Sequence, residues 1–160
     1  PDLFEDRIIG AEGSIVLDLE GFRVEGQFLF QHDDPITAGT PAFEIENRLK
    51  LQGAAVVHDR IVIPAALFKG LTEKRLRERP STIYHLYQTG FGITVVRALE
   101  RVRAVAADRT AARLLGVAPG APVLQIRRIA LTFNDKPVEY RVSTLHSAQH
   151  EYVNLVSRPQ

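Results

Sequence analysis

Arg48 and Lys50 lie two positions apart in a segment whose apolar residues have the spacing of a β-strand. Side chains two residues apart project from the same face of a strand, so this pair could hold one anionic group between two positive charges. The plainer interpretation is a solvated strand face, because most charged side chains on strands contact only water. The pair therefore indicates either an anion site or ordinary surface.

Asp59 and Glu139 lie on the returning strands of two predicted hairpins. They could accept hydrogen bonds from hydroxyl or amine groups of a ligand if they face a common cavity, and paired carboxylates can also serve acid–base catalysis. For each carboxylate alone, a surface role is the alternative. Basic residues precede both turns, at 48–50 and 127–128, which indicates an internal repeat or the chance convergence of two hairpins.

Glu100 belongs to a segment, 93–106, that is rich in β-branched residues and alternates like a strand. Its neighbours on the same face are apolar: Ala98, Val102, Ala104 and Ala106. A carboxylate on an apolar face is costly to bury unless it finds a partner. We therefore expect Glu100 to form an ion pair with an arginine.

The sequence contains no recognisable catalytic, metal or cofactor motif, because G-x-S-x-G, the P-loop, G-x-G-x-x-G and H-E-x-x-H are all missing. Of the histidines, only His146 and His150 have the spacing of two metal ligands on a helix, and their segment has the pattern of a strand end and loop. Ser81 and Thr82 bring hydroxyl groups close to Tyr84, but helix capping explains them first. We expect no catalytic residue, no metal and no cofactor.

The composition suits one domain spanning residues 1–160, with 45% apolar residues and no cysteine for disulfides or thiolate sites. Lys and Arg number 20 against 19 Asp and Glu, so net charge gives no reason to expect nucleic acid or an anionic membrane as a partner. No segment resembles a spanning helix or signal peptide, which predicts a cytoplasmic protein. Because the chain starts at Pro1 and lacks methionine, we expect a processed or excised product whose N-terminal domain has been removed.

The elements that would position these residues are predicted from spacing and from turn residues. Strands are expected in two pieces within 14–30, in a hairpin over 43–63 that turns at Gln52-Gly53, over 93–106, and in a hairpin over 122–145. Helices are expected from Pro64 to about 79, from Ser81 to Gly90, and from Asp108 to Gly116. Strands joined mainly by hairpins, with short helices between them, predict an antiparallel α+β domain.

Four motifs occur in one order: Ser81-Thr82-Ile83-Tyr84-His85-Leu86, Gly90-Phe91-Gly92, Leu114-Leu115-Gly116-Val117-Ala118-Pro119-Gly120 and Pro137-Val138-Glu139. Together they resemble the UTRA domain, the ligand-sensing module of the HutC subfamily of GntR-type bacterial transcription regulators. The resemblance covers residues 43–152 and is most specific over 81–139. It implies a fold similar to that of chorismate lyase, a homodimer, and a winged-helix DNA-binding domain outside this chain.

The resemblance also implies a small-molecule pocket. Its effector contacts would come from Arg48 and Lys50, from Asp59 on the hairpin partner, from Ser81 at the start of the following helix, and from Glu139; we add Tyr84 and Glu100 to these candidates. Lys50 replaces a second arginine often seen in the family, which keeps the charge but loses the planar fork, so the resemblance implies an effector with some anionic group. Leu145 and His146 depart from the aromatic residue and arginine common there, whereas Tyr152 fits.

The leading hypothesis is therefore an effector-sensing and dimerisation module whose ligand alters the operator affinity of a separate DNA-binding domain. The main alternative is an enzyme related to chorismate lyase, in which Arg48 and Lys50 hold substrate carboxylates and Glu139 acts as an acid. A scaffold without a small ligand is the third possibility, but it leaves the resemblance to a sensor unexplained.

Overall fold

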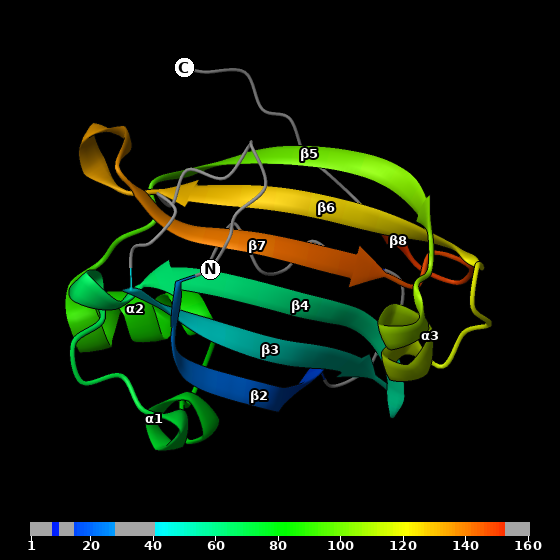
Figure 1. The fold of residues 1–160 in the computed structure, drawn as a ribbon, viewed down its shortest axis with the longest axis horizontal. Helices are drawn as coiled ribbons and strands as arrows, with labels where there is room; N and C mark the ends of the chain where they lie inside the picture. Colours follow the sequence, from blue (N-terminus) through cyan, green and yellow to red (C-terminus); the bar gives the residue numbers. More distant parts are fainter. Residues whose placement is uncertain (1–7, 10–14, 28–40, 153–160) are drawn as a thin grey trace.

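A six-stranded antiparallel sheet dominates the computed structural model, which describes the backbone of residues 8–9 and 15–27 and all atoms of 41–152 (Figure 1). The strands run in the order β2-β3-β4-β7-β6-β5. Their bounds are β2 (Ile15–Gln27), β3 (Pro41–Leu51), β4 (Ala54–Pro64), β5 (Arg97–Ala106), β6 (Pro122–Leu131) and β7 (Pro137–Leu145). The observed fold confirms the predicted antiparallel α+β class.

The sheet consists of two three-stranded halves that meet where β4 pairs with β7. Each half contains one of the two predicted hairpins, β3 with β4 and β6 with β7. The returning strands of the two hairpins therefore lie side by side at the centre of the sheet. Carboxylates that are 80 positions apart in sequence, Asp59 and Glu139, come onto adjacent strands in this way.

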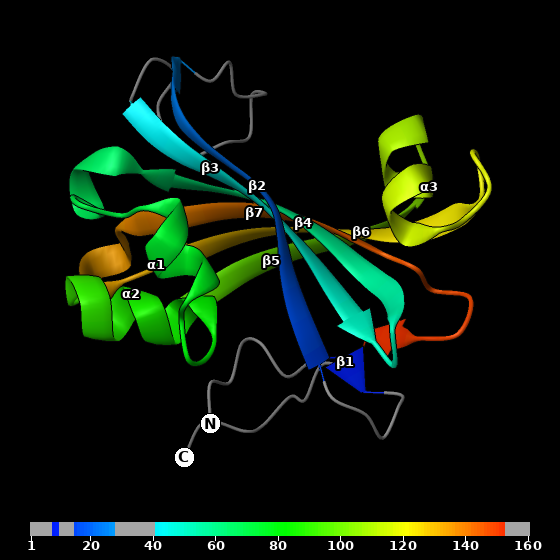
Figure 2. The same ribbon diagram turned by 90° about the horizontal axis from the view of Figure 1, so that it is seen from below.

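The described part of the fold has three short helices, two near one end of the twisted strands, α1 (Glu73–Arg77) and α2 (Ile83–Phe91), and one near the other end, α3 (Arg109–Leu115) (Figure 2). Each helix begins at a side-chain cap: the side chains of Thr72, Thr82 and Asp108 each accept a hydrogen bond from a backbone N–H in the first turn. Gly92 and Gly116 end α2 and α3 in the left-handed conformation that glycine adopts without strain.

The largest apolar core lies between α2 and the central strands. Phe68, Tyr87 and the strand residues Ile45, Ile61 and Ile63 are almost completely inaccessible to water in it. A separate small core holds α3 against β6. Because the larger core anchors α2 on the sheet, the polar side chains of α2 are brought down onto the strands as well.

Most predicted elements are confirmed, and the Gln52-Gly53 turn has the positive φ angles, 50° and 83°, that a two-residue hairpin needs. The single helix predicted from Pro64 to about 79 is wrong. That segment forms a 3-10 helix, Ala65–Leu67, and then α1, because Gly70 turns the chain at φ 80° before Thr72 starts a new helix.

Three other expectations need correction. The two strands expected within 14–30 form one strand, β2, whose irregular pairing between Leu19 and Gly21 takes the place of the predicted break; residues 28–30 lie outside the described residues. The strand expected from residue 93 begins at Arg97. The cap of α2 is Thr82 rather than Ser81.

Two smaller elements accompany the main sheet and its helices. β1 (Ile8–Ile9) and β8 (Glu151–Tyr152) pair as a separate two-stranded sheet, which fixes the backbone of Tyr152 beside an N-terminal segment. A 3-10 turn, Phe133–Asp135, connects β6 to β7. Within the described residues, no helix has the length and apolar character needed to cross a membrane.

Candidate functional site

A connected set of buried charged side chains lies on one face of the sheet, the face onto which α2 packs. Successive strand residues point to opposite faces, so cross-strand partners identify each face. Asp59 is opposite Ser143, Arg141 is opposite Arg128, and Arg128 is opposite Glu100. We call this side, which also carries Glu139, the network face, and the other side the opposite face.

Glu139 is the most enclosed charged group of the described residues, with 0% of its surface exposed. Its carboxylate accepts hydrogen bonds from the hydroxyls of Tyr84 (3.0 Å) and Tyr87 (2.7 Å), both on α2. It also accepts two from the Arg141 guanidinium, from Nε at 2.8 Å and from Nη2 at 3.0 Å. Four donors therefore saturate this carboxylate and connect the helix to the centre of the sheet.

The electrostatics of this group follow from burial and from Arg141. Burial alone would raise the pKa of Glu139, but the Arg141 charge and the hydrogen bonds from Arg141 and Tyr87 outweigh it and hold that pKa below the ordinary value of 4.5. Burial and the nearby Glu139 charge raise the pKa of both Tyr84 and Tyr87 above 10.0. At neutral pH the site thus contains an ionised carboxylate, a guanidinium and two neutral phenols.

Asp59 lies at the other side of Arg141 and has fewer partners. The Ser143 hydroxyl donates to Asp59 Oδ1 at 2.5 Å, while Arg141 Nη1 is 3.7 Å from Asp59 Oδ2, an ion-pair contact longer than a hydrogen bond. Asn47, the direct cross-strand partner of Asp59, is 6% exposed, and its buried Oδ1 has no hydrogen-bond partner.

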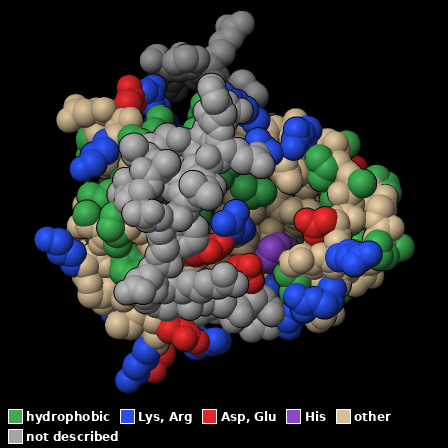
Figure 3. Space-filling model, viewed as in Figure 1, with side chains coloured by type: hydrophobic (Ala, Val, Ile, Leu, Met, Phe, Trp, Pro, Cys, Tyr) green, Lys and Arg blue, Asp and Glu red, His purple; other side chains and the backbone are tan. Residues whose placement is uncertain are grey.

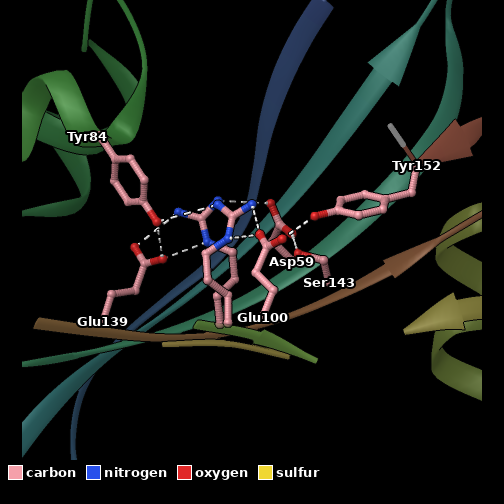
Figure 4. A network of polar contacts seen from close by, with 8 residues as sticks. Asp59, Tyr84, Glu100, Glu139, Ser143 and Tyr152 are labelled. Carbon is pink, nitrogen blue, oxygen red and sulfur yellow. Dashed lines mark hydrogen bonds and ion pairs between the residues drawn. The ribbon is translucent and has the colours of Figure 1, made fainter. Parts of the chain in front are cut away.

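A second ion pair extends the cluster towards the C-terminal segment. Arg128 contacts Glu100 Oε1 through Nε at 2.7 Å and Nη2 at 2.6 Å, and its Nη1 lies 3.5 Å from the Tyr84 hydroxyl. Tyr152 donates to the other oxygen of Glu100. Figure 4 shows Tyr84 and Glu139 at one end of the resulting network and Tyr152 at the other, with Asp59, Ser143 and Glu100 between them. The predicted pairing of Glu100 with an arginine is confirmed.

The network brings together four of the predicted site residues, namely Asp59, Tyr84, Glu100 and Glu139. Arg48 and Lys50 are not among them. They alternate with Asn47 on β3, and Arg48 is paired with His58, so both lie on the opposite face. Ser81 is exposed just before α2 and belongs to neither group.

A single irregularity explains why Asp59 is separated from Arg48 and Lys50. Near the turn Lys50 pairs with Ala55, but after a register shift Leu49 pairs with Val57. Without the extra residue on β4, Asp59 would stand opposite Glu46 and share a face with Arg48. The β-bulge shifts the alternation of β4 side chains by one residue and so places Asp59 on the network face.

Sequence reasoning missed Arg141, Ser143, Tyr87 and, as a site residue, Arg128. A signal was present for three of them. Residues 139, 141 and 143 alternate along one strand and must share a face. Tyr87 follows Tyr84 by three positions, which places both on one side of a helix. Arg128 joins the site only through the pairing of β6 with β5 and β7, so its place could not be derived locally.

The described residues offer little support for a metal site. They contain no cluster of three or more His, Asp or Glu side chains suited to metal binding. The rings of His146 and His150 are 6.4 Å apart between centroids, beyond β7 rather than on a helix.

On the side seen in Figure 3, the visible basic and acidic side chains of the described part are interspersed. A shallow surface depression is lined by Leu99, Arg101, Arg127, Ile129 and Tyr140. These residues are cross-strand neighbours on the opposite face, so this depression is separate from the network.

Comparisons with known proteins agree with this architecture. The UTRA domain family model matches residues 35–151. The ligand-binding domain of a Bordetella bronchiseptica protein assigned to the GntR family of transcriptional regulators superposes with a TM-score of 0.85. It is 31% identical, and the match covers 94% of this chain and 96% of that domain.

More distant structures share the fold alone. The effector domain of PhnF from Mycobacterium smegmatis has a TM-score of 0.71 at 19% identity, covering 91% of this chain and 88% of that one. YydK from Bacillus subtilis has a TM-score of 0.75 at 14% identity, and the match covers 91% of this chain but 63% of that one. The comparison with curated proteins gives no match.

Proposed function

The chain belongs to the UTRA domain family, and from that membership we propose that it is the effector-sensing and dimerisation module of a GntR/HutC-type bacterial transcription regulator. In this proposal a small molecule binds at the network face and alters the operator affinity of a DNA-binding domain that lies outside the described residues. Such a regulator acts in the cytoplasm.

The buried network is the observation that carries this proposal. It contains charged groups from β4, β5, β6 and β7 and phenols from α2, most of them hydrogen-bonded to one another. Buried charges are costly when they serve stability alone, and hydrophobic replacements are often as stable. A ligand that exchanged hydrogen bonds with these groups would touch both halves of the sheet and bias the position of α2.

The regulatory mechanism is thermodynamic linkage. A ligand shifts an equilibrium between two arrangements only by the difference in its affinity for them. Couplings between two sites are typically about 1 to 3 kcal/mol, which corresponds to roughly 5- to 150-fold in affinity. A dimer doubles the number of operator half-sites that such a shift affects, which is why dimerisation is part of the proposal.

The anionic group expected in the effector remains part of the proposal, with two possible positions. Arg48 and Lys50 would hold it on the opposite face. The guanidiniums of the network face are each already paired, Arg128 with Glu100 and Arg141 with Glu139. An anion at the network face would therefore have to compete with a carboxylate, whereas one at Arg48 and Lys50 would bind away from the network.

The proposed role is regulatory and includes no catalytic step. In the lyase alternative Glu139 would act as an acid, but its lowered pKa keeps it ionised at neutral pH. A carboxylate held in this state by Arg141 and two tyrosines is a poor proton donor. Incubation with chorismate, followed for 4-hydroxybenzoate and pyruvate, tests this directly, and robust turnover would contradict the regulatory proposal.

A thermal-shift screen against central metabolites, sugar phosphates and aromatic acids tests the proposal, because a ligand of the native state raises the melting temperature. A compound that stabilises the protein should then be titrated against Ser143→Ala and Glu139→Gln on the network face and Arg48→Ala on the opposite face. Lys74→Gln, on the exposed surface of α1, is the matched control.

We expect Ser143→Ala to weaken binding and Lys74→Gln to leave it unchanged. If Arg48→Ala were the only variant that lost binding, the effector site would lie on the opposite face. Equal affinity in the wild type, Ser143→Ala, Glu139→Gln and Arg48→Ala would contradict the candidate site as a whole.

A further inference from the structure

The Asn47–Asp59 pair is a buried acceptor site with too few donors. The two residues are direct cross-strand partners on the network face, and each is 6% exposed. Asp59 receives one hydrogen bond, from Ser143, and Asn47 Oδ1 receives none. Buried polar atoms without partners are uncommon in folded proteins and cost free energy unless something satisfies them.

The charges around this pair point to the chemistry that is missing. Asp59 and Glu139 contribute two negative charges, and Arg141 lies between them with one positive charge. Arg141 makes both of its short contacts with Glu139, at 2.8 and 3.0 Å, and remains 3.7 Å from Asp59. The Arg141 charge therefore fully compensates the Glu139 carboxylate but only partly compensates the Asp59 carboxylate.

We propose that Asn47 and Asp59 recognise a positively charged nitrogen group of the effector, such as an ammonium, amidinium or guanidinium. This group would donate one hydrogen bond to Asn47 Oδ1 and another to Asp59 while neutralising the Asp59 charge. The inference rests on the proposed effector-binding function and narrows the class of effector. A neutral hydroxyl would satisfy Asn47 but leave the charge, and a carboxylate or phosphate would be repelled by Asp59.

An effector that carries both a positive and a negative group would bind in one orientation. Its nitrogen end would face β3 and β4 at Asn47 and Asp59, and any anionic group would lie away from this pair. Ser143 would keep Asp59 in place, since its hydroxyl occupies Oδ1 and leaves Oδ2 towards Arg141. Amine or guanidinium compounds should therefore bind better than acids of the same shape.

Titration of the full chain with benzylammonium and benzoate, which match in shape but differ in charge, tests the inference. Amide NMR spectra locate binding directly, because the side-chain amide signals of Asn47 can be assigned by their loss in Asn47→Ala. We expect benzylammonium to shift these signals and benzoate to leave them in place. Asp59→Asn should weaken benzylammonium binding at least about tenfold, whereas Lys74→Gln, on the exposed surface of α1, should not.

Three outcomes would overturn the inference: benzoate binding at this pair as well as benzylammonium, benzylammonium affinity unchanged by Asp59→Asn, or no shift with either probe. Spectral dispersion in each variant shows whether it remains folded, and Asn47→Ala provides a second variant if Asp59→Asn does not fold. The proposed function is judged separately by the metabolite screen. An effector that binds the network face without a cationic nitrogen would refute this inference and leave the proposed function standing.

Discussion

The two carboxylates of the central strands, Glu139 on β7 and Asp59 on β4, differ sharply in their partners. Both are buried on the network face and both contact Arg141. Glu139 accepts four hydrogen bonds, from two tyrosines of α2 and twice from Arg141. Asp59 accepts one, from Ser143, and its cross-strand partner Asn47 has an unpaired oxygen.

This difference separates a structural role from a recognition role within one network. A saturated buried carboxylate has no capacity left for a ligand, and its removal leaves donors unpaired. An unsaturated carboxylate contributes little to folding but keeps its binding capacity. We therefore interpret Glu139 as the group that fixes α2 on the sheet and Asp59 as the group available to an effector.

Glu139→Gln should have the largest effect on stability. It removes the charge that compensates Arg141, and breaking a buried ion pair costs about 3 to 5 kcal/mol. Urea unfolding followed by circular dichroism measures the loss in free energy of unfolding. Glu78→Gln, whose side chain is 67% exposed on the surface near α1, is the control and should change stability little. A cost below about 1 kcal/mol for Glu139→Gln would contradict the structural role.

Tyr87→Phe should have the next largest effect. The phenol is fully buried and donates to Glu139 at 2.7 Å, and a hydrogen bond to a charged group contributes about 1.5 to 3 kcal/mol. The substitution keeps the ring and its contact with Phe68, so the loss reports the hydroxyl alone. Tyr140→Phe, a partly exposed tyrosine on the opposite face, is the comparison variant. Equal unfolding curves for the wild type and Tyr87→Phe would mean that Glu139 does not depend on this donor.

The stability gap between wild type and Tyr87→Phe should also depend on pH. The Tyr87 hydrogen bond favours the ionised form of Glu139 and helps to lower its pKa below 4.5. A lowered native pKa contributes stability above the unfolded pKa, and this contribution disappears as pH falls through the native value. The gap should therefore be constant from pH 7 to about 5.5 and shrink below about 4.5. A gap that widened in acid would show that the Tyr87 hydroxyl stabilises the protonated form of Glu139 rather than the carboxylate.

Local signals in the sequence are sufficient for much of the fold. Asp108, Gly116 and the Gln52-Gly53 turn were predicted where they occur, because caps and tight turns depend on a few adjacent residues. Alternation around Glu100 also predicted that it would need an arginine, and Arg128 takes that place. These features require no knowledge of which strands become neighbours.

The composition of the site could be predicted only in part, because it depends on strand register. Arg48, Lys50 and Asp59 were expected on one surface. An extra residue on β4, opposite Leu49 and Lys50, turns Asp59 to the other face and separates it from the two basic residues. Arg141 shares a face with Glu139 on one strand, so that pairing had a local signal, but its contact with Asp59 appears only when β7 pairs with β4. A one-residue irregularity thus decides which charges share a face.

Asp59→Asn should have the smallest effect on stability and is the most direct test of the comparison with Glu139. The change keeps the shape of the side chain, and Arg141 retains both short contacts with Glu139. Removal of a poorly compensated buried charge offsets the weaker bond from Ser143, so stability should stay within about 1 kcal/mol of wild type. Urea unfolding at pH 7, beside Glu139→Gln, measures this. If Asp59→Asn were as destabilising as Glu139→Gln, both carboxylates would be structural, and the free binding capacity attributed to Asp59 would be disproved.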